Sequence, residues 1–148
     1  MRALREIYLE PFRLVMKHTQ ASPPRCWMTA LNPVNGTHAS ESRFLLEDVL
    51  REEWGFKGLI MSDWTGVYST AESIKAGVCP HSAQPRAATD DRTGLDIEMP
   101  APGVYRGNTV NRALQSGKLL PKDVDARARK VRPPTPPQIM RLTQGPGA

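Results

Sequence analysis

The sequence predicts an α/β fold in which short parallel strands alternate with helices. Three apolar segments have the length and character of short strands: residues 25–31, 58–64 and 95–98. Helical patterns with apolar residues at intervals of three and four separate them. This alternation favours parallel βα units over an all-helical or all-β fold. The chain has 148 residues, the size of one ordinary domain, with a composition that suits a globular core.

The first half of the chain supplies the first expected elements. Residues 2–18 form an amphipathic helical pattern that Pro11 is expected to bend or split, because proline lacks an N–H and clashes with the preceding turn. A loop at residues 22–24 leads to the first strand, and residues 32–36 carry Asn, Pro and Gly in a pattern typical of a turn.

Further helices are expected on either side of the second and third strands. One follows Ser42 and ends at Gly55. The others are expected over about residues 67–76, over 108–116, and over 121–131, where a proline stands at the start and its missing N–H costs nothing.

The segment from Gly58 to Trp64 is the most informative in the chain. Leu59, Ile60 and Met61 suit a strand buried on both faces, and Ser62, Asp63 and Trp64 follow at its carboxyl end. In parallel α/β sheets the side chains at that end line the binding crevice. The residues alone leave two interpretations of Asp63 open: a functional carboxylate, or an acid that caps the next helix or turn.

The net charge of +5 does not by itself indicate a nucleic-acid partner. Neither an aromatic-interleaved basic platform nor a zinc-finger spacing accompanies it. The late basic residues are expected to form a solvated helix face that complements the helix dipole: Lys118, Lys122, Arg127, Arg129, Lys130 and Arg132. No apolar run approaches the roughly 20 residues of a membrane span. The first residues form no apolar signal region and Cys26 and Cys79 make no disulfide framework, so neither defines a compartment.

Several ordered motifs resemble the nucleophile-bearing region of glycoside hydrolase family 3, the β-glucosidase family. The resemblance covers roughly residues 2–131 with one interruption. The segments that carry it are Met28–Gly36 (MTALNPVNG), Glu53–Gly58 (EWGFKG), Ser62–Trp64 (SDW), Ala71–Gly77 (AESIKAG), Gly94–Pro100 (GLDIEMP) and Ala113–Lys118 (ALQSGK).

This resemblance implies an incomplete (β/α)8 TIM-type barrel, of which the chain holds about the last three βα units. A closed barrel needs on the order of 200 residues or more. Residues 1–131 are expected to be the C-terminal part of the family's N-terminal barrel domain, interrupted by an atypical polar insertion at 78–94. Residues 132–148 form a Pro/Gly-rich tail that is expected to be disordered or to act as a polyproline ligand. Within the insertion, Cys79 and His81 with Asp90 and Asp91 match no metal-ligand spacing.

The resemblance also assigns roles to individual residues. Asp63 matches the catalytic nucleophile of a retaining enzyme, in which one carboxylate attacks the sugar and a second group protonates the leaving oxygen. Trp64 is expected to contact the sugar, or to be an ordinary packed aromatic, and Met28 to line the same pocket or to fill the core. Glu98 lies in a structural segment and is expected to pair or cap. The acid/base is expected to come from a later domain absent from this chain, and neither a metal nor a cofactor is implied.

Two positions depart from the family pattern: Leu31 stands where a tyrosine usually hydrogen-bonds the nucleophile, and Pro33 where Lys or Gln is common. The implied function is β-glucosidase-type retaining hydrolysis of terminal β-D-glucosyl residues, as in cellulose-derived oligosaccharides, with a carbohydrate substrate and no nucleic-acid or membrane partner. The isolated chain is expected to be inactive. The alternative is a non-catalytic pseudoenzyme fragment or interaction piece that uses its basic helix and Pro-rich tail.

Overall fold

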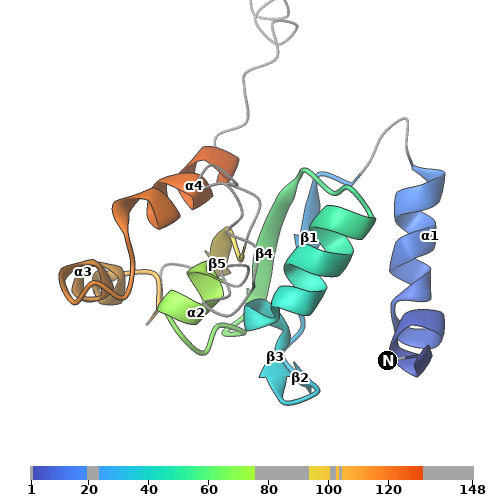
Figure 1. The fold of residues 1–148 in the computed structure, drawn as a ribbon, viewed down its shortest axis with the longest axis horizontal. Coiled ribbons are helices and arrows are strands. Elements are labelled where there is room, and N and C mark those ends of the chain that lie inside the picture. The colour runs from blue at the N-terminus through green and yellow to red at the C-terminus, as the bar shows by residue number, and fades with distance from the viewer. Residues whose placement is uncertain (1, 20–23, 76–93, 101–102, 104, 132–148) are drawn as a thin grey trace, which may run out of the picture.

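The computed structural model describes residues 2–19, 24–75, 94–100, 103 and 105–131. Within these ranges, β1 (Cys26–Met28), β4 (Leu59–Trp64) and β5 (Ile97–Met99) form a parallel sheet in the order β1-β4-β5 (Figure 1). The predicted α/β class with parallel strands is therefore confirmed. The predictions for the insertion, apart from Gly94, and for the tail lie outside the described residues.

The N-terminal helical segment is split, as Pro11 predicts. The π-helix η1 (Leu4–Tyr8) ends before Leu9, and α1 (Glu10–His18) begins with Pro11 in its first turn. Proline is tolerated there because the first N–H groups of a helix have no partner within it. The two short helices lie to one side of the sheet, beyond β1 (Figure 1).

The predicted turn at residues 32–36 is part of a small hairpin that the sequence analysis does not anticipate. Strands β2 (Pro33–Val34) and β3 (Thr37–His38) pair antiparallel, with Asn35 and Gly36 between them at φ angles of 51° and 83°. Asn and Gly tolerate positive φ best, and a two-residue loop of this kind matches the twist of the flanking strands.

The central helix, η3 (Phe44–Glu53), has π-type bonding and follows the short 3-10 helix η2 (Ala39–Glu41). It ends before Gly55, which has a φ of 69°, so the predicted stop is confirmed. Gly58 then brings the chain back to the sheet. A Cβ on Gly58 would overlap the backbone oxygen of Arg25, so no larger residue fits between β1 and the start of β4 without a shift.

The later elements follow the prediction with two differences. Helix α2 (Ala71–Ile74) starts four residues later than expected, because Val67 is drawn into the core instead of a helical turn. The third strand runs over Ile97–Met99, not 95–98, because the amide of Leu95 donates to the carbonyl of Ser73 outside the sheet. Helices α3 (Asn108–Gln115) and α4 (Pro121–Val131) lie where they are expected.

The core lies between η3 and one face of β4. Its buried members are Leu46, Leu50, Phe56, Ile60, Val67 and Leu95. A smaller cluster joins α2 to the segment around α3: Ile74, Ala113 and Leu119. Side chains alternate along a strand, so Met61 and Asp63 lie on the other face, where both are only half-buried. None of the helices in the described ranges is long and apolar enough to cross a membrane.

Candidate active site

Asp63 lies at the carboxyl end of β4, the central strand of the sheet. Its neighbour Ser62 is fully buried, and the Ser62 hydroxyl accepts a hydrogen bond from the Met99 amide at 2.9 Å. This bond ties the end of β4 to β5. Because Ser62 faces the core, strand alternation turns Asp63 toward the open face.

A sharp turn directly follows Asp63. The Asp63 Oδ1 accepts the N–H of Trp64 at 2.6 Å, and the Asp63 carbonyl accepts the N–H of Gly66 at 3.0 Å. Thr65 has a φ of 59°, an uncommon conformation for a β-branched residue, and its amide donates to the Met99 carbonyl at 3.1 Å. Strained backbone of this kind clusters at functional sites.

Asp63 accepts an amide hydrogen bond within this turn, but it does not cap a helix. Helix α2 begins at Ala71, too far along the chain for capping by Asp63, and has no side-chain cap. Among the described residues, Asp63 makes no ion pair and no side-chain hydrogen bond besides that with the Trp64 amide. The carboxylate is therefore held by one local donor on an open face of the sheet.

Met28 lies on the same face as Asp63. Met28 and Met61 are partners in the parallel register, so their side chains point the same way, and Asp63 follows two residues after Met61. The Met28 side chain is 52% exposed in this chain. Trp64 pairs in register with Met99 of β5, and its side chain is 64% exposed.

The side chains of Leu31 and Asp63 both lie close to Gly66. A Cβ built on Gly66 would lie 3.3 Å from Leu31 Cδ2 and 3.4 Å from Asp63 Cβ. An isobutyl group donates no hydrogen bond, so Leu31 contributes shape and not charge stabilisation at this position.

A ring pair that the sequence analysis misses fixes the backbone of Leu31. The rings of His38 and Tyr68 stack with centroids 3.6 Å apart and an interplanar angle of 20°. Tyr68 Oη donates to the Leu31 carbonyl at 3.1 Å, and His38 Nδ1 lies 3.3 Å from the same oxygen. The two residues are 30 positions apart in the sequence, and neither has a local pattern that indicates the pair.

Behind the sheet, Asp96 is the centre of a buried ion network. Its carboxylate accepts hydrogen bonds from Arg51 at 2.9 Å, Arg127 at 3.1 Å and the Ile60 amide at 2.7 Å. Burial lowers the pKa of the Arg51 guanidinium, and the negative charge of Asp96 opposes this effect. Arg51 also donates to the carbonyls of Phe56 and Gly58, which hold the turn before β4.

The predicted solvated basic face is wrong for Arg127. Its side chain is only 5% exposed and bonds Asp96 and the Gly94 carbonyl. A signal for this network was present in the sequence: Glu47 and Arg51 stand one turn apart beside Leu46 and Leu50, on the apolar side of the helix.

A second acid at this end of the sheet, Glu98, holds the backbone of the segment that follows β5. Glu98 Oε2 accepts the amides of Arg106 at 2.8 Å and Gly103 at 3.2 Å, both in the segment before α3. Burial lowers the pKa of Arg106, beside Glu98, to about 10. No group of three or more His, Cys, Asp or Glu residues suited to a metal ion occurs within the described ranges. Cys79, His81, Asp90 and Asp91 lie outside them.

The comparisons with known proteins agree with the motifs around Asp63. The model of the glycosyl hydrolase family 3 N-terminal domain matches residues 1–133. The chain belongs to glycoside hydrolase family 3. It is 47% identical over 130 residues to a probable β-glucosidase J of Emericella nidulans, which covers 88% of this chain and 13% of that protein. The family 3 chain thus spans only about an eighth of the length of this relative.

Solved structures of family members superimpose on the same region. The crystal structure of a β-glucosidase from Kluyveromyces marxianus in complex with glucose matches with a TM-score of 0.70 at 46% identity, over 88% of this chain and 14% of that one. β-glucosidase 3B from Thermotoga neapolitana, in complex with α-D-glucose, matches with a TM-score of 0.69 at 33% identity, over 87% and 16%.

Proposed function

We propose that this chain supplies the nucleophile strand of a β-glucosidase-type retaining glycoside hydrolase, with Asp63 as the nucleophile. The observation that carries the proposal is a half-buried carboxylate on the open face of a parallel sheet, at the carboxyl end of β4, in a chain of family 3. The relatives named β-glucosidase support β-glucosides as the substrate class. Within that class, the proposed substrates are terminal β-D-glucosyl residues, as in cellulose-derived oligosaccharides.

In the proposed reaction, a carboxylate oxygen of Asp63 attacks the anomeric carbon while the bond to the leaving oxygen breaks. A general acid protonates that oxygen, and water then releases the sugar with retained configuration. The Trp64 amide, which donates to Asp63 Oδ1, stabilises the negative charge of the attacking group in the free enzyme. No cofactor is needed, because carboxyl groups and water supply every proton and electron pair.

Trp64 and Met28 are the proposed sugar contacts. The indole offers a flat apolar face for the C–H face of a pyranose ring, and its exposure leaves that face available. Met28, on the Asp63 face of the sheet, would border the same sugar.

In this proposal, residues 1–131 form about the last three units of a (β/α)8 barrel, and the sheet is part of them. The acid/base belongs to a part of the protein outside this chain. A missing acid/base costs ~10²–10⁴-fold in rate. Missing pocket walls would cost more, because they position the sugar. The isolated chain is therefore expected to be inactive.

Two measurements test the proposal. First, an aryl β-glucoside with an activated leaving group is offered to the purified chain, because such a substrate needs little acid assistance; we expect no turnover above that of Asp63→Ala. Second, in the Kluyveromyces marxianus enzyme, only the segment that aligns with residues 24–75 of this chain is replaced by those residues. The hybrid should turn over, and lose activity by at least ~10³-fold with Asp63→Ala, as for loss of a covalent nucleophile.

Asp125→Ala, an exposed carboxylate on α4, is the matched control in the isolated chain. In the hybrid, the control is Asp48→Ala, a partly exposed acid that pairs with Arg43. A hybrid that keeps its activity after Asp63→Ala would refute the nucleophile assignment. Turnover by the isolated chain that depends on Asp63 would refute only the expected inactivity.

The second candidate function is a non-catalytic chain, and Leu31 favours it. An apolar side chain beside Asp63 removes a donor from the nucleophile's surroundings. A folded hybrid without turnover, in which Leu31→Tyr restores activity, would identify a pseudoenzyme. The basic helix is a weaker basis for this alternative, because Arg127 is committed to Asp96.

A further inference from the structure

The turn that follows Asp63 is held from two sides. On the β5 side, the Thr65 amide donates to the Met99 carbonyl at 3.1 Å. On the β1 side, the turn packs closely against the segment after β1, because a Cβ on Gly66 would lie 3.3 Å from Leu31 Cδ2 and 3.4 Å from Asp63 Cβ. A shift of the Leu31 backbone would therefore change the space around Asp63.

Two side chains from distant segments hold the Leu31 backbone in place. Tyr68 Oη donates to the Leu31 carbonyl at 3.1 Å, and His38 Nδ1 lies 3.3 Å from the same oxygen. A carbonyl oxygen has two lone pairs, so both are used when Nδ1 carries the ring proton. The rings stack with centroids 3.6 Å apart, which keeps the two donors side by side.

This ring pair joins three parts of the chain at one oxygen. His38 ends β3 of the small hairpin, Tyr68 follows the turn after β4, and Leu31 follows β1. The hairpin lies at the end of the sheet where β4 ends (Figure 1). The pair therefore connects the turn that bears Asp63 to the hairpin and to the segment after β1.

The ring pair lies at the surface and not in the core. Tyr68 is 39% exposed and His38 is partly exposed, and neither is among the residues of the two core clusters. The neighbour of Tyr68, Val67, is by contrast 2% exposed. Half-exposed rings gain little from burial, so the main effect of the pair is on the geometry of the backbone that it holds.

We propose that His38 and Tyr68 form a clamp that positions the Asp63 carboxylate for attack on the sugar, an inference that rests on the proposed role of Asp63 as nucleophile. Both are positioning residues, because they act through the Leu31 backbone and the turn at Gly66. A displacement of about 1 Å can cost ~10²-fold in rate. The β5 side still holds the turn when the clamp is removed, so we expect a smaller loss, ~10-fold.

The kinetic test uses the hybrid enzyme that carries residues 24–75. The kcat/KM for an activated aryl β-glucoside measures the attack by Asp63, because such a substrate needs little acid assistance. The inhibition constant of glucose measures sugar binding without reaction. We expect His38→Ala and Tyr68→Ala each to lower kcat/KM ~10-fold and to change the glucose inhibition constant by less than ~2-fold.

Three further variants show whether the two rings act as a unit. The double variant of His38 and Tyr68 should lose about as much as either single variant, ~10-fold, whereas independent residues would lose ~100-fold. Tyr68→Phe keeps the ring and removes only the donor, so it should retain more activity than Tyr68→Ala. Thr37→Ala, the exposed neighbour of His38 on β3, is the matched control and should change neither constant.

A second measurement tests the clamp in the 148-residue chain itself and requires no turnover. The Gly66 amide donates to the Asp63 carbonyl at 3.0 Å, and the Ile60 amide of β4 donates to Asp96 at 2.7 Å. We expect Tyr68→Ala to speed hydrogen exchange of the Gly66 amide at least ~10-fold and that of the Ile60 amide by less than ~2-fold, because only the turn is released. A general loss of stability would speed both.

Four results would overturn the proposal: unchanged kcat/KM in a hybrid whose activity depends on Asp63, a glucose inhibition constant that rises as much as kcat/KM falls, additive losses in the double variant, or no selective acceleration of the Gly66 amide. The first of these leaves the proposed function standing. A hybrid that keeps its activity after Asp63→Ala would refute the nucleophile and the clamp together, so the two failures are distinguishable. In a hybrid without turnover, the exchange rates decide.

Discussion

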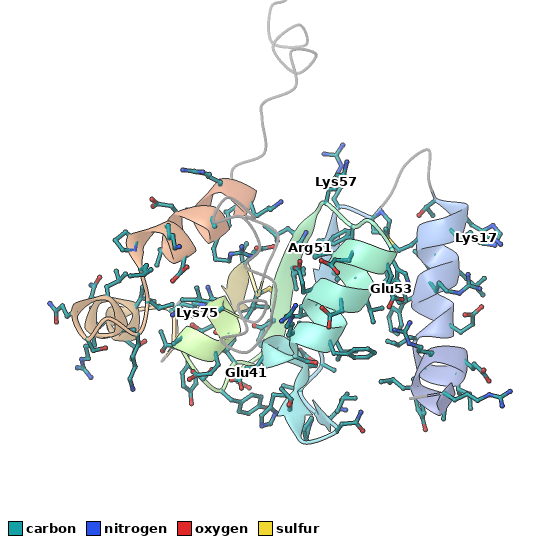
Figure 2. The ribbon with its side chains drawn as sticks, in the orientation of Figure 1. Lys17, Glu41, Arg51, Glu53, Lys57 and Lys75 are labelled. Atoms are coloured by element: carbon teal, nitrogen blue, oxygen red, sulfur yellow. The ribbon has the colours of Figure 1, made fainter. Side chains whose placement is uncertain are left out.

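The two sides of β4 are built in different ways. Toward β5, Asp96 joins η3, β4 and α4 through Arg51, the Ile60 amide and Arg127, all buried. Toward β1, the N-terminal helices are held by the surface pair of Arg5 and Glu53, by the edge contact of Phe12 with Trp27 and by Met16, which packs against the core. Figure 2 shows Arg51 and Glu53 leaving η3 in different directions, the first toward the sheet and the second toward α1.

This difference shows which side of β4 is stabilised more strongly by contacts within the described residues. A buried charge network contributes only when every member is present, and here it connects elements that lie up to 76 residues apart in the sequence (Arg51 to Arg127). An exposed ion pair contributes little, and the side chains that line a cavity of about 470 Å³ between the N-terminal helices, β1 and η3 lose packing contacts on one side. The position of Asp63 therefore depends mainly on the β5 side.

Removing Asp96 is expected to have the largest effect on stability. Asp96→Ala leaves Arg51 and Arg127 buried without their carboxylate and the Ile60 amide without its acceptor. Breaking a buried pair costs ~3–5 kcal/mol of unfolding free energy, enough to unfold a marginal domain. Urea denaturation followed by tryptophan fluorescence measures it. Glu53→Ala is the control on the other side, and an equal loss from both variants would contradict the comparison.

Truncating apolar side chains should also reduce the free energy of unfolding more in the core beside β4 than at the N-terminal helices, with smaller losses than Asp96→Ala. Ile60 of β4 is fully buried in the core on the η3 side of the sheet, so Ile60→Ala should cost ~2–5 kcal/mol. Phe12 is 46% exposed and makes one edge-to-face contact with Trp27, with centroids 5.3 Å apart, so Phe12→Ala should cost about 1 kcal/mol. Chemical denaturation of both variants gives the two values. A larger cost for Phe12→Ala would mean that the N-terminal helices are integral to the folded core.

The smallest effect concerns the pH dependence of the Arg5–Glu53 pair. The Arg5 guanidinium, by its hydrogen bonds, holds the pKa of the Glu53 carboxyl below its ordinary value of 4.5. When the pKa of a carboxyl group is lower in the folded state than in the unfolded state, the ionised group stabilises the fold at pH values above its unfolded-state pKa. This stabilisation is lost as the pH falls through the folded-state pKa. Wild type and Glu53→Gln should therefore differ slightly at pH 7 and converge below pH 4.5. The measurement is the urea midpoint at each pH, with 1 M salt as a control that should also reduce the difference.

Local patterns predict most of the elements correctly because their causes are local. Pro11 splits the first helix, Gly55 ends η3 and Asn35-Gly36 makes a turn. The α2 and β5 boundaries are shifted because Val67 and Leu95 are recruited by the core, which no local pattern reveals. For the same reason the basic residues of the last helix are predicted as one exposed face, although Arg127 is buried against Asp96.

By itself, the sequence determined the α/β class, the order of the parallel strands and longer helices along the chain, the family, and the candidates Asp63, Trp64 and Met28, because these depend on residue types at short spacings. Only the tertiary structure decided which charges are buried together, that His38 and Tyr68 stack and both contact the Leu31 carbonyl, and that a cavity lies beside β1. Those features join residues tens of positions apart, and their energies come from burial and contact that arise only when the sheet and helices pack.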